Sequence, residues 1–268
     1  MDLQLNGRRA LVSGSSSGIG TGIARMLAQE GCAVVVHGRN RERTEAVARE
    51  INAAGVALGD LGTDDGAAAV HEQARAALGG SVEILVNNAG GSATDSTTRG
   101  PLDVTISEWV TNYHGNTLAA VRLIQLAVPD MIAAGWGRVI QISSAVALQP
   151  NYLGPDYTGA KAALNNFTVT LAGSLHSSGI TVNTVSPGVI MTDGLIRFAR
   201  EQYGRPEMSV AEITAQMVSD KIFELPPSGR LGTDEDVGLA VCMLASPRAG
   251  FVTGSNYRVD GGQVRAVI

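Results

Sequence analysis

A tyrosine and a lysine stand four residues apart in the segment Tyr157-Thr158-Gly159-Ala160-Lys161. Residues with this spacing lie on one face of a helix, so we expect the phenol and the ammonium group to be neighbours. A free tyrosine titrates near pH ~10, whereas a nearby ammonium favours the phenolate and lowers the tyrosine pKa. A phenol tuned in this way suits a general acid that protonates a carbonyl oxygen.

Two further observations bear on this pair. Of the 20 cationic residues only Lys161 and Lys221 are lysines, although arginine would serve a solvated surface equally well. Ser144 follows the apolar segment 138–143 and precedes Tyr157 in the chain. Its hydroxyl could bind the oxygen of a substrate, or it could simply cap a turn.

A glycine-rich segment near the N-terminus could bind phosphate. Ser13-Gly14-Ser15-Ser16-Ser17-Gly18-Ile19-Gly20 lies between a predicted strand and a predicted helix. Its spacing is Gly-x-x-x-Gly-x-Gly, which differs from the standard dinucleotide fingerprint. Glycines let the backbone approach a pyrophosphate closely, and the helix N-terminus favours its negative charge. The alternative is an ordinary turn between a strand and a helix.

The end of the second predicted strand indicates which dinucleotide would bind. In Val34-Val35-Val36-His37-Gly38-Arg39-Asn40 there is no acidic residue where an NAD enzyme would hold the ribose 2′-hydroxyl. Arg39 is suited to a 2′-phosphate. We therefore predict NADP(H) in preference to NAD(H), against the alternative that Arg39 is a solvated charge.

The elements that must position these residues alternate along the chain. Short apolar segments predict strands at 9–13, 33–37, 56–58, 82–87, 138–143 and 180–185, and amphipathic segments predict helices at 19–29, 41–53 and 64–78. Two long helices are expected at about 107–134 and 157–177. Apolar strands that alternate with helices indicate a parallel sheet covered on both faces. The predicted fold class is therefore α/β, a doubly wound, Rossmann-like parallel sheet.

Two connections are longer than the others. Residues 91–107 are rich in Gly, Ser and Thr and predict a loop, while 192–229 mixes apolar and charged residues. No repeat or composition shift marks a second domain, so we expect a single domain over residues 1–268, with a substrate lid at about 193–229. The apolar residues of this segment could line a substrate pocket or pack on one another: Leu195, Ile196, Phe198, Tyr203, Met208, Ile213, Met217, Ile222 and Phe223.

Composition excludes several classes of protein. The net charge is −5 and 44% of residues are hydrophobic, so we expect neither disorder nor a nucleic-acid partner. Two cysteines and four histidines without metal-ligand spacing predict no metal site. The N-terminus has no signal-peptide pattern, and no apolar run approaches the ~20 residues of a membrane span. We therefore expect a cytoplasmic protein without a membrane partner.

Taken together, these motifs resemble the short-chain dehydrogenase/reductase family, including its 3-oxoacyl-carrier-protein reductase-like members. The resemblance covers nearly the whole chain. It includes, in order, Gly14-x-x-x-Gly18-Ile19-Gly20, Asp60, Asn87-Asn88-Ala89-Gly90, Asn116, Ser144, Tyr157-x-x-x-Lys161, Pro187-Gly188-x-x-x-Thr192, Gly229-Arg230-Leu231-Gly232 and Asp260-Gly261-Gly262. Ser13 replaces the usual threonine. Ser17 stands where many NADP-binding members carry a basic residue, which leaves Arg39 as the main 2′-phosphate ligand.

The resemblance implies a role for each matched residue. Tyr157 would be the general acid/base, Lys161 would bind the nicotinamide ribose, Ser144 would orient the carbonyl, and Asn116 would hold a proton-relay water. Trp109-x6-Asn116 fits the family pattern, whereas Asn112 is out of register. The predicted cofactor-binding residues are Gly14, Ser16, Ser17, Gly18, Ile19, Gly20, Arg39, Asp60, Leu61, Asn87, Ala89, Gly90, Tyr157, Lys161, Pro187, Gly188, Ile190 and Thr192.

Three functions remain open on the sequence. The first is an NADP(H)-dependent oxidoreductase that acts on a free small-molecule ketone or secondary alcohol. The second is a 3-oxoacyl-carrier-protein reductase, which would need positive charge near the site to bind an acidic carrier. The segment 162–192 carries no Lys or Arg, which favours the first. The third is a non-catalytic cofactor-binding sensor or scaffold. The resemblance also implies a homotetramer or a dimer.

Overall fold

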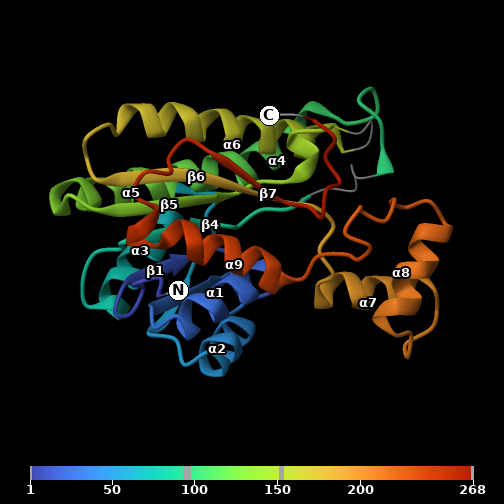
Figure 1. Cartoon of the computed structure of the whole chain (residues 1–268), viewed down its shortest axis with the longest axis horizontal. Helices are drawn as coiled ribbons and strands as arrows, with labels where there is room; N and C mark the ends of the chain where they lie inside the picture. Colours follow the sequence, from blue (N-terminus) through green and yellow to red (C-terminus); the bar gives the residue numbers. More distant parts are fainter. Residues whose placement is uncertain (1, 93–97, 151–153, 267–268) are drawn as a thin grey trace.

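The computed structural model describes residues 2–92, 98–150 and 154–266. Within them, a sheet of parallel strands runs through the centre of the molecule (Figure 1) in the order β3-β2-β1-β4-β5-β6-β7. The strands are β1 (Arg9–Val12), β2 (Ala33–Gly38), β3 (Gly55–Leu58), β4 (Ile84–Asn87), β5 (Gly137–Ile142), β6 (Ile180–Pro187) and β7 (Asn256–Val259). The predicted doubly wound α/β class is confirmed.

Helices cover both faces of this sheet. Helix α1 (Ile19–Gln29) and helix α9 (Asp234–Ala245) pack with the strands around one hydrophobic cluster. On the opposite face, a second cluster joins the strands to α3 (Asp64–Leu78), α5 (Ala119–Ala134) and α6 (Pro155–Ser174). Helix α2 (Arg41–Glu50) lies beside α1. Because both faces are buried, the strands are mostly apolar. Strand β6 nevertheless carries buried polar residues, namely Thr181, Asn183, Thr184 and Ser186.

The observed bounds agree with most of the predicted elements. The first six strands and the first three helices lie where the sequence predicts them, with ends that differ by up to three residues. The predicted helix at 107–134 is continuous but consists of three parts: α4 (Ile106–Tyr113), a π-helical turn η2 (His114–Leu118) and α5. Strand β7 was not predicted. Of the expected loop at 91–107, residues 93–97 lie outside the described residues.

The stretch Ile106–Ala134 corrects the expectation about apolar runs. In the described part of the chain it alone has the length and composition of a membrane span, since an 18-residue window within it has a mean hydropathy of 1.4. The apolar side of this stretch is nevertheless buried inside the protein. Leu123, Ala127 and Met131 of α5 belong to the hydrophobic cluster that also contains residues of α3 and against which residues of α6 pack. A core helix of a doubly wound sheet meets the same criteria.

Residues 193–229 form a separate projection beyond one end of the sheet (Figure 1). It carries α7 (Asp193–Gln202) and α8 (Val210–Ser219). The two ends of the projection meet, because the Met191 amide donates to the Gly232 carbonyl at 2.8 Å and the Gly232 amide donates to the Val189 carbonyl at 3.1 Å. The two ends of the projection therefore meet at one base. The projection also contacts the C-terminal segment, where the Ser228 amide donates to the Gly261 carbonyl at 2.9 Å and Glu224 forms an ion pair with Arg265 at 3.3 Å.

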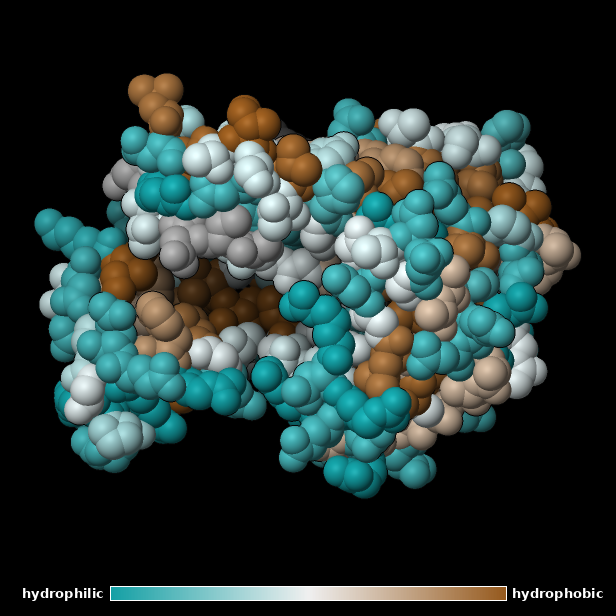
Figure 2. Space-filling model, turned by 180° about the vertical axis from the view of Figure 1, so that it is seen from behind, coloured by the Kyte–Doolittle hydropathy of each residue, from teal (hydrophilic) through white to brown (hydrophobic). Residues whose placement is uncertain are grey.

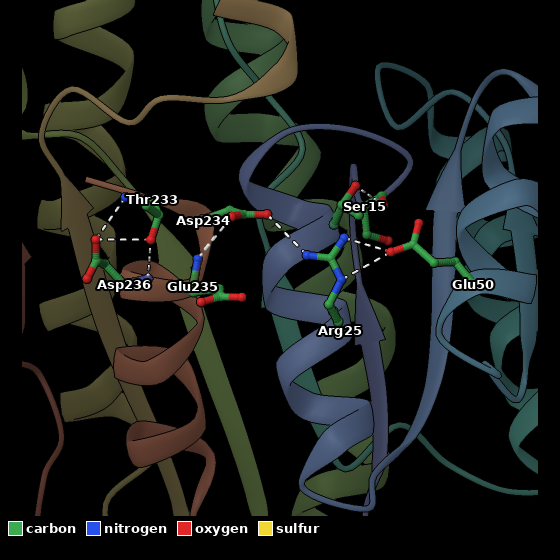
Figure 3. A network of polar contacts seen from close by, with 8 residues as sticks. Ser15, Arg25, Glu50, Thr233, Asp234, Glu235 and Asp236 are labelled. Atoms are coloured by element: carbon green, nitrogen blue, oxygen red, sulfur yellow. Dashed lines mark hydrogen bonds and ion pairs between the residues drawn. The ribbon is translucent and has the colours of Figure 1, made fainter. Parts of the chain in front are cut away.

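Polar contacts stabilise the base of the projection where the chain leaves it and enters α9 (Figure 3). Thr233 and Asp236 form a capping box at the start of α9, and Arg230 makes two hydrogen bonds, of 2.7 and 2.8 Å, to the Asp236 carboxylate. Arg25 of α1 lies between Asp234 and Glu50 and contacts both carboxylates, at 3.5 and 2.7 Å. These contacts link the base of the projection to α1, the helix that follows the glycine-rich segment.

Candidate active site

The glycine-rich segment makes a tight turn between β1 and α1. Gly14 has φ of 63°, and a Cβ atom there would lie 2.8 Å from the Ala89 Cα atom. Gly18 has φ of 60° and is the N-cap of α1. The Ser13 hydroxyl accepts hydrogen bonds from the amides of Asn88 and Ala89, at 3.0 and 2.9 Å. Only glycine fits this approach of two backbones without strain, so the turn lies directly against the end of β4.

A cavity of about 530 Å³ follows the carboxyl ends of the strands from this turn to α6. Its volume is in the range of small-molecule and cofactor sites. Figure 2 shows from behind a hollow with hydrophobic residues on its floor, between the α7–α8 projection and the rest of the molecule. Fourteen of the predicted cofactor-binding residues line the cavity: Gly14, Ser16, Ser17, Gly18, Ile19, Gly20, Arg39, Asp60, Leu61, Ala89, Gly90, Tyr157, Lys161 and Thr192.

Four predicted cofactor-binding residues do not line this cavity. Asn87 is buried in the sheet at the end of β4, and Ile190 is buried where it bridges to Gly232. Gly188 donates to the Val259 carbonyl at 3.0 Å, and Pro187 is the last residue of β6. Asn87 is paired with Gln141 of β5, whereas the other three belong to the pairing of β6 with β7 and to the base of the projection.

Arg39 is exposed at the edge of the cavity, directly after β2. Close beside it lie Gly38 and the Ser16 hydroxyl, since a Cβ atom on Gly38 would lie 2.6 Å from the Ser16 Oγ atom. A guanidinium group and a hydroxyl at the end of β2 are suited to a phosphate group.

Tyr157 and Lys161 line the other side of the cavity, and Ser144, which does not line it, lies next to the lining residue Ser143. The Ser144 side chain is close enough to Tyr157 to lower the pKa of its phenol. The Lys161 Nζ atom lies 5.8 Å from the centre of the Tyr157 ring and donates to the Ile142 carbonyl at 2.8 Å. Ser144 also caps the short 3₁₀ helix that follows it, as its Oγ atom accepts from the Val146 amide at 3.4 Å. The position of Ser144 is therefore compatible both with binding the oxygen of a substrate and with capping a turn.

Burial sets the protonation of this group. It raises the pKa of Tyr157, an effect that the Ser144 side chain opposes. It lowers the pKa of Lys161 to about 8. The predicted lowering of the tyrosine pKa by the ammonium is thus wrong for the protein alone, because removal of the phenol from water raises this pKa and Lys161 is not among the groups that shift it. The phenol remains protonated at neutral pH, which is the form that donates a proton.

Asn116 lies in the π-helical turn between α4 and α5. Its side chain makes two hydrogen bonds to the backbone of Gly91. The Oδ1 atom accepts from the Gly91 amide at 2.9 Å, and the Nδ2 atom donates to the Gly91 carbonyl at 2.9 Å. It also donates to the Asn112 carbonyl at 3.0 Å. A Cβ atom on Gly90 would lie 2.5 Å from the Asn116 Oδ1 atom and 3.3 Å from the Lys161 Nζ atom, so the two side chains meet at this glycine. π-Helical turns occur frequently at functional sites.

The apolar residues of segment 193–229 mostly pack on one another. Met208, Ile213 and Met217 are buried in a cluster of their own, against which Leu195, Ile196, Tyr203 and Phe223 pack. Phe198 and Ile222 are more than half exposed. A second cavity, of about 1160 Å³, lies between α8 and α9 and is lined neither by Ser144 nor by Tyr157 or Lys161. The structure therefore favours the packing alternative for the buried residues.

Several cavity residues were not predicted. His37 lines the cavity although it lies in an apolar strand, where a histidine is usually a satisfied core residue. Asn88, Gly91, Ser92 and Ser143 line it as well, each adjacent to a predicted residue or motif. The Asn-Asn-Ala-Gly motif was the available signal for Asn88. For His37 the only signal was its place next to Gly38 and Arg39.

Comparison with known proteins gives consistent matches. A family model described as short chain dehydrogenase matches residues 8–202. A 3-oxoacyl-[acyl-carrier-protein] reductase of Pseudomonas aeruginosa is 35% identical over 264 residues, which cover 97% of this chain and 98% of the relative. The 7α-hydroxysteroid dehydrogenase of Escherichia coli is 30% identical, with 98% and 97% covered.

Solved structures agree with these matches. The crystal structure of L-sorbose reductase from Gluconobacter frateurii, complexed with NADPH and L-sorbose, superimposes with a TM-score of 0.89 at 33% identity and full coverage of both chains. A 7α-hydroxysteroid dehydrogenase complexed with NADH and 7-oxo glycochenodeoxycholic acid gives a TM-score of 0.84 at 30% identity, covering 100% and 98%. Proteins of similar fold thus bind either nicotinamide cofactor.

Proposed function

The chain belongs to the short-chain dehydrogenase/reductase family of oxidoreductases, and from this premise we propose an NADP(H)-dependent enzyme that interconverts the carbonyl group of a free small-molecule ketone and the corresponding secondary alcohol. The observation that carries the proposal is that Tyr157 and Lys161 both line the cavity, with the Lys161 Nζ atom 5.8 Å from the Tyr157 ring and the Ser144 side chain close to the phenol. A sensor or scaffold would need only the glycine-rich turn and not this group.

The cavity fits a dinucleotide in its residues as well as in its volume. Gly14 and Gly18 leave the turn free of Cβ atoms, and the N-terminus of α1 offers its positive end to a pyrophosphate. Arg39 and Ser16 would hold a 2′-phosphate, while Asp60 and Leu61 would border the adenine. When bound, the nicotinamide cofactor supplies or accepts the hydride of the reaction.

Side chains of this protein would transfer the proton to and from the substrate oxygen. Tyr157, kept protonated by burial, would donate its hydroxyl proton to the oxygen of the substrate during reduction. Ser144 would hydrogen-bond the same oxygen and so fix its position. Lys161, which titrates at about 8, carries its charge at neutral pH and would stabilise the phenolate that Tyr157 becomes. Asn116 would keep the loop at Gly91 in place next to this group.

The test is the oxidation of NADPH, followed by absorbance, with a set of chemically diverse ketones. Tyr157→Phe should lower kcat by a factor on the order of 10²–10⁴ or more, because the proton donor is lost. Its affinity for NADPH should change little, because the ring remains in place. A Tyr157→Phe enzyme that turns over at the wild-type rate would contradict the mechanism. The control is Tyr113→Phe, a partly exposed tyrosine of α4 that does not line the cavity.

A second candidate is a 3-oxoacyl-carrier-protein reductase, which is favoured by the 35% identity to the enzyme of that name. Against it, no Lys or Arg occurs between residues 162 and 192 to bind an acidic carrier protein. Comparison of kcat/KM for a carrier-bound 3-oxoacyl thioester and for free ketones separates the two. We expect the free ketones to react faster.

The assembly and the compartment stay predictions: a homotetramer or a dimer, in the cytoplasm. Support for an assembly comes from large apolar side chains that are more than half exposed on the outer helices, namely Ile106 and Val110 of α4, Ile132 of α5 and Val169 of α6. Light scattering measures the mass directly. A monomer at micromolar concentration would contradict the expected assembly.

A further inference from the structure

His37 makes contacts that tie the glycine-rich turn to two strands. Its Nδ1 atom accepts a hydrogen bond from the Gly14 amide at 2.8 Å, and its Nε2 atom lies 3.2 Å from the Gly59 carbonyl, just after β3. The Ser15 amide donates to the His37 carbonyl at 2.9 Å, and the His37 amide donates to the Ser15 hydroxyl at 3.0 Å. The residue is 3% exposed and lines the candidate cofactor cavity. The imidazole therefore bridges the turn that would approach the cofactor and the strand end that would border its adenine.

The contacts determine the tautomer of this ring. A backbone amide can only donate, so Nδ1 must be unprotonated to accept from Gly14. A carbonyl can only accept, so Nε2 must carry the proton toward Gly59. Both contacts are made at once only by a neutral imidazole protonated on Nε2. A second proton, on Nδ1, would place two donors against each other at Gly14.

We propose that His37 is a positioning residue for the cofactor-binding turn, which it holds in its binding conformation only as the neutral, Nε2-protonated imidazole. This inference rests on the proposed use of the cavity for a dinucleotide. Gly14 has a left-handed backbone conformation, and its neighbours on the turn line the cavity. The hydrogen bond from its amide therefore fixes the part of the turn that lies nearest the ligand.

The surroundings keep His37 neutral at physiological pH. Burial lowers its pKa below the ordinary value of about 6.5, and the positive charge of Arg39 lowers it further. The Gly59 carbonyl and the Asp60 carboxylate act in the opposite direction. The turn on its other side, 13–20, contributes no titratable side chain. Acidification below this pKa adds the proton on Nδ1 and removes the acceptor for Gly14, so the turn should lose its shape in acid and bind the cofactor less tightly.

Two isosteric variants separate the two contacts. In His37→Asn the amide oxygen takes the place of Nδ1, so the acceptor for Gly14 is kept and cannot titrate. In His37→Gln the amide nitrogen takes the place of Nε2, so the contact to Gly59 is kept and Gly14 loses its partner. His71→Asn is the matched control, because His71 is also buried but lies on α3 and does not line the cavity.

The measurement is the dissociation constant of NADPH and, separately, of NADH, from cofactor fluorescence at pH ~7.5 and at a series of lower pH values down to the acid limit of the folded protein. NADH lacks the 2′-phosphate, whose own protonation near pH ~6 would otherwise contribute to the change. We expect His37→Gln to bind about tenfold more weakly at pH ~7.5, the usual effect of one unpaired buried donor. Wild type and His71→Asn should lose affinity on acidification, and His37→Asn should lose clearly less.

The inference is overturned if wild type and His37→Asn lose affinity in parallel, or if wild type binds more tightly in acid because the imidazolium attracts phosphate. Imidazole ¹⁵N shifts of the wild-type protein test the tautomer without any variant, and a proton on Nδ1 at neutral pH would also overturn it. Failure of the proposed function looks different, since wild type would then bind neither NADPH nor NADH at pH ~7.5.

Discussion

The side-chain amide of Asn112 donates a hydrogen bond to the carboxylate of Asp156, one residue before Tyr157. Both residues are almost completely buried, at 0% and 1% exposure, between α4 and the first turn of α6. The Asn112 carbonyl also accepts from Asn116. A single residue thus connects the π-helical turn that carries Asn116 to the helix that carries Tyr157 and Lys161.

Replacement of Asn112 by leucine should therefore lower both stability and turnover. A buried carboxylate that loses a donor costs roughly 1–3 kcal/mol of unfolding free energy. Displacement of Tyr157 should lower kcat, with little effect on the affinity for NADPH. Urea unfolding and steady-state kinetics measure the two effects. Thr111→Ala, on the exposed side of the same helix, is the control and should stay within ~0.5 kcal/mol of wild type.

Lys161 should make the wild-type protein less stable at neutral pH than at alkaline pH. Its pKa is about 8 in the folded protein and near 10.4 in an unfolded chain. Between these values the unfolded chain binds more protons, so the free energy of unfolding rises with pH; below pH ~8 the folded protein bears the full cost of the buried charge. Lys161→Met should consequently be more stable than wild type by roughly 2 kcal/mol at pH ~7, after the loss of the bond to Ile142.

Urea unfolding of wild type and Lys161→Met between pH ~7 and ~10 checks the sign of this effect. The difference in unfolding free energy should shrink as the pH rises, since the wild-type ammonium is then deprotonated in the folded state. The same variant should lose turnover. A Lys161→Met protein that is less stable than wild type at every pH would show that the ammonium is not an unfavourable buried charge.

Arg39 should determine the choice between the two nicotinamide cofactors. Arg39→Asp removes a positive charge next to the proposed 2′-phosphate and supplies an acceptor for a ribose hydroxyl. The ratio of kcat/KM for NADPH to that for NADH should fall by about 10- to 100-fold, which corresponds to one or two charge-assisted hydrogen bonds. Arg43→Asp makes the same charge change on α2 without altering the cavity wall and serves as the control. An unchanged ratio in Arg39→Asp would contradict the assignment.

The sequence predicted the elements with strong patterns and missed those that depend on tertiary context. Apolar runs located β1 to β6, because strands buried on both faces are mostly apolar, although β6 also carries buried polar residues such as Asn183 and Ser186. Strand β7 has the sequence Asn-Tyr-Arg-Val and lies at the edge of the sheet, where two of its four residues are exposed and no apolar run arises. The π-helical turn at His114–Leu118 leaves no mark on a helical pattern that continues through it.

The parts of the candidate site that contain glycine clusters or residues at a fixed spacing could be predicted from the sequence. The turn at Gly14 and the group of Ser144, Tyr157 and Lys161 lie where their spacing places them. Asn87 and Ile190 were assigned to the cofactor, but both are buried and neither lines the cavity, since membership of a motif does not say in which direction a side chain points. His37 was overlooked for the converse reason. A polar side chain in an apolar strand is normally satisfied within the core, and here its partners are the backbone of the site itself.

The base that joins Met191 to Gly232 has a consequence for how substrate preference can change. Both ends of segment 193–229 meet there, and its helices pack around their own cluster of Ala199, Met208, Ile213 and Met217. The segment also contacts the C-terminal segment, through Ser228 with Gly261 and Glu224 with Arg265. Since loop length has a small entropic cost, we expect that the corresponding segment of a relative can be grafted between the two anchors to change the substrate range, as long as its partners at Gly261 and Arg265 are exchanged with it.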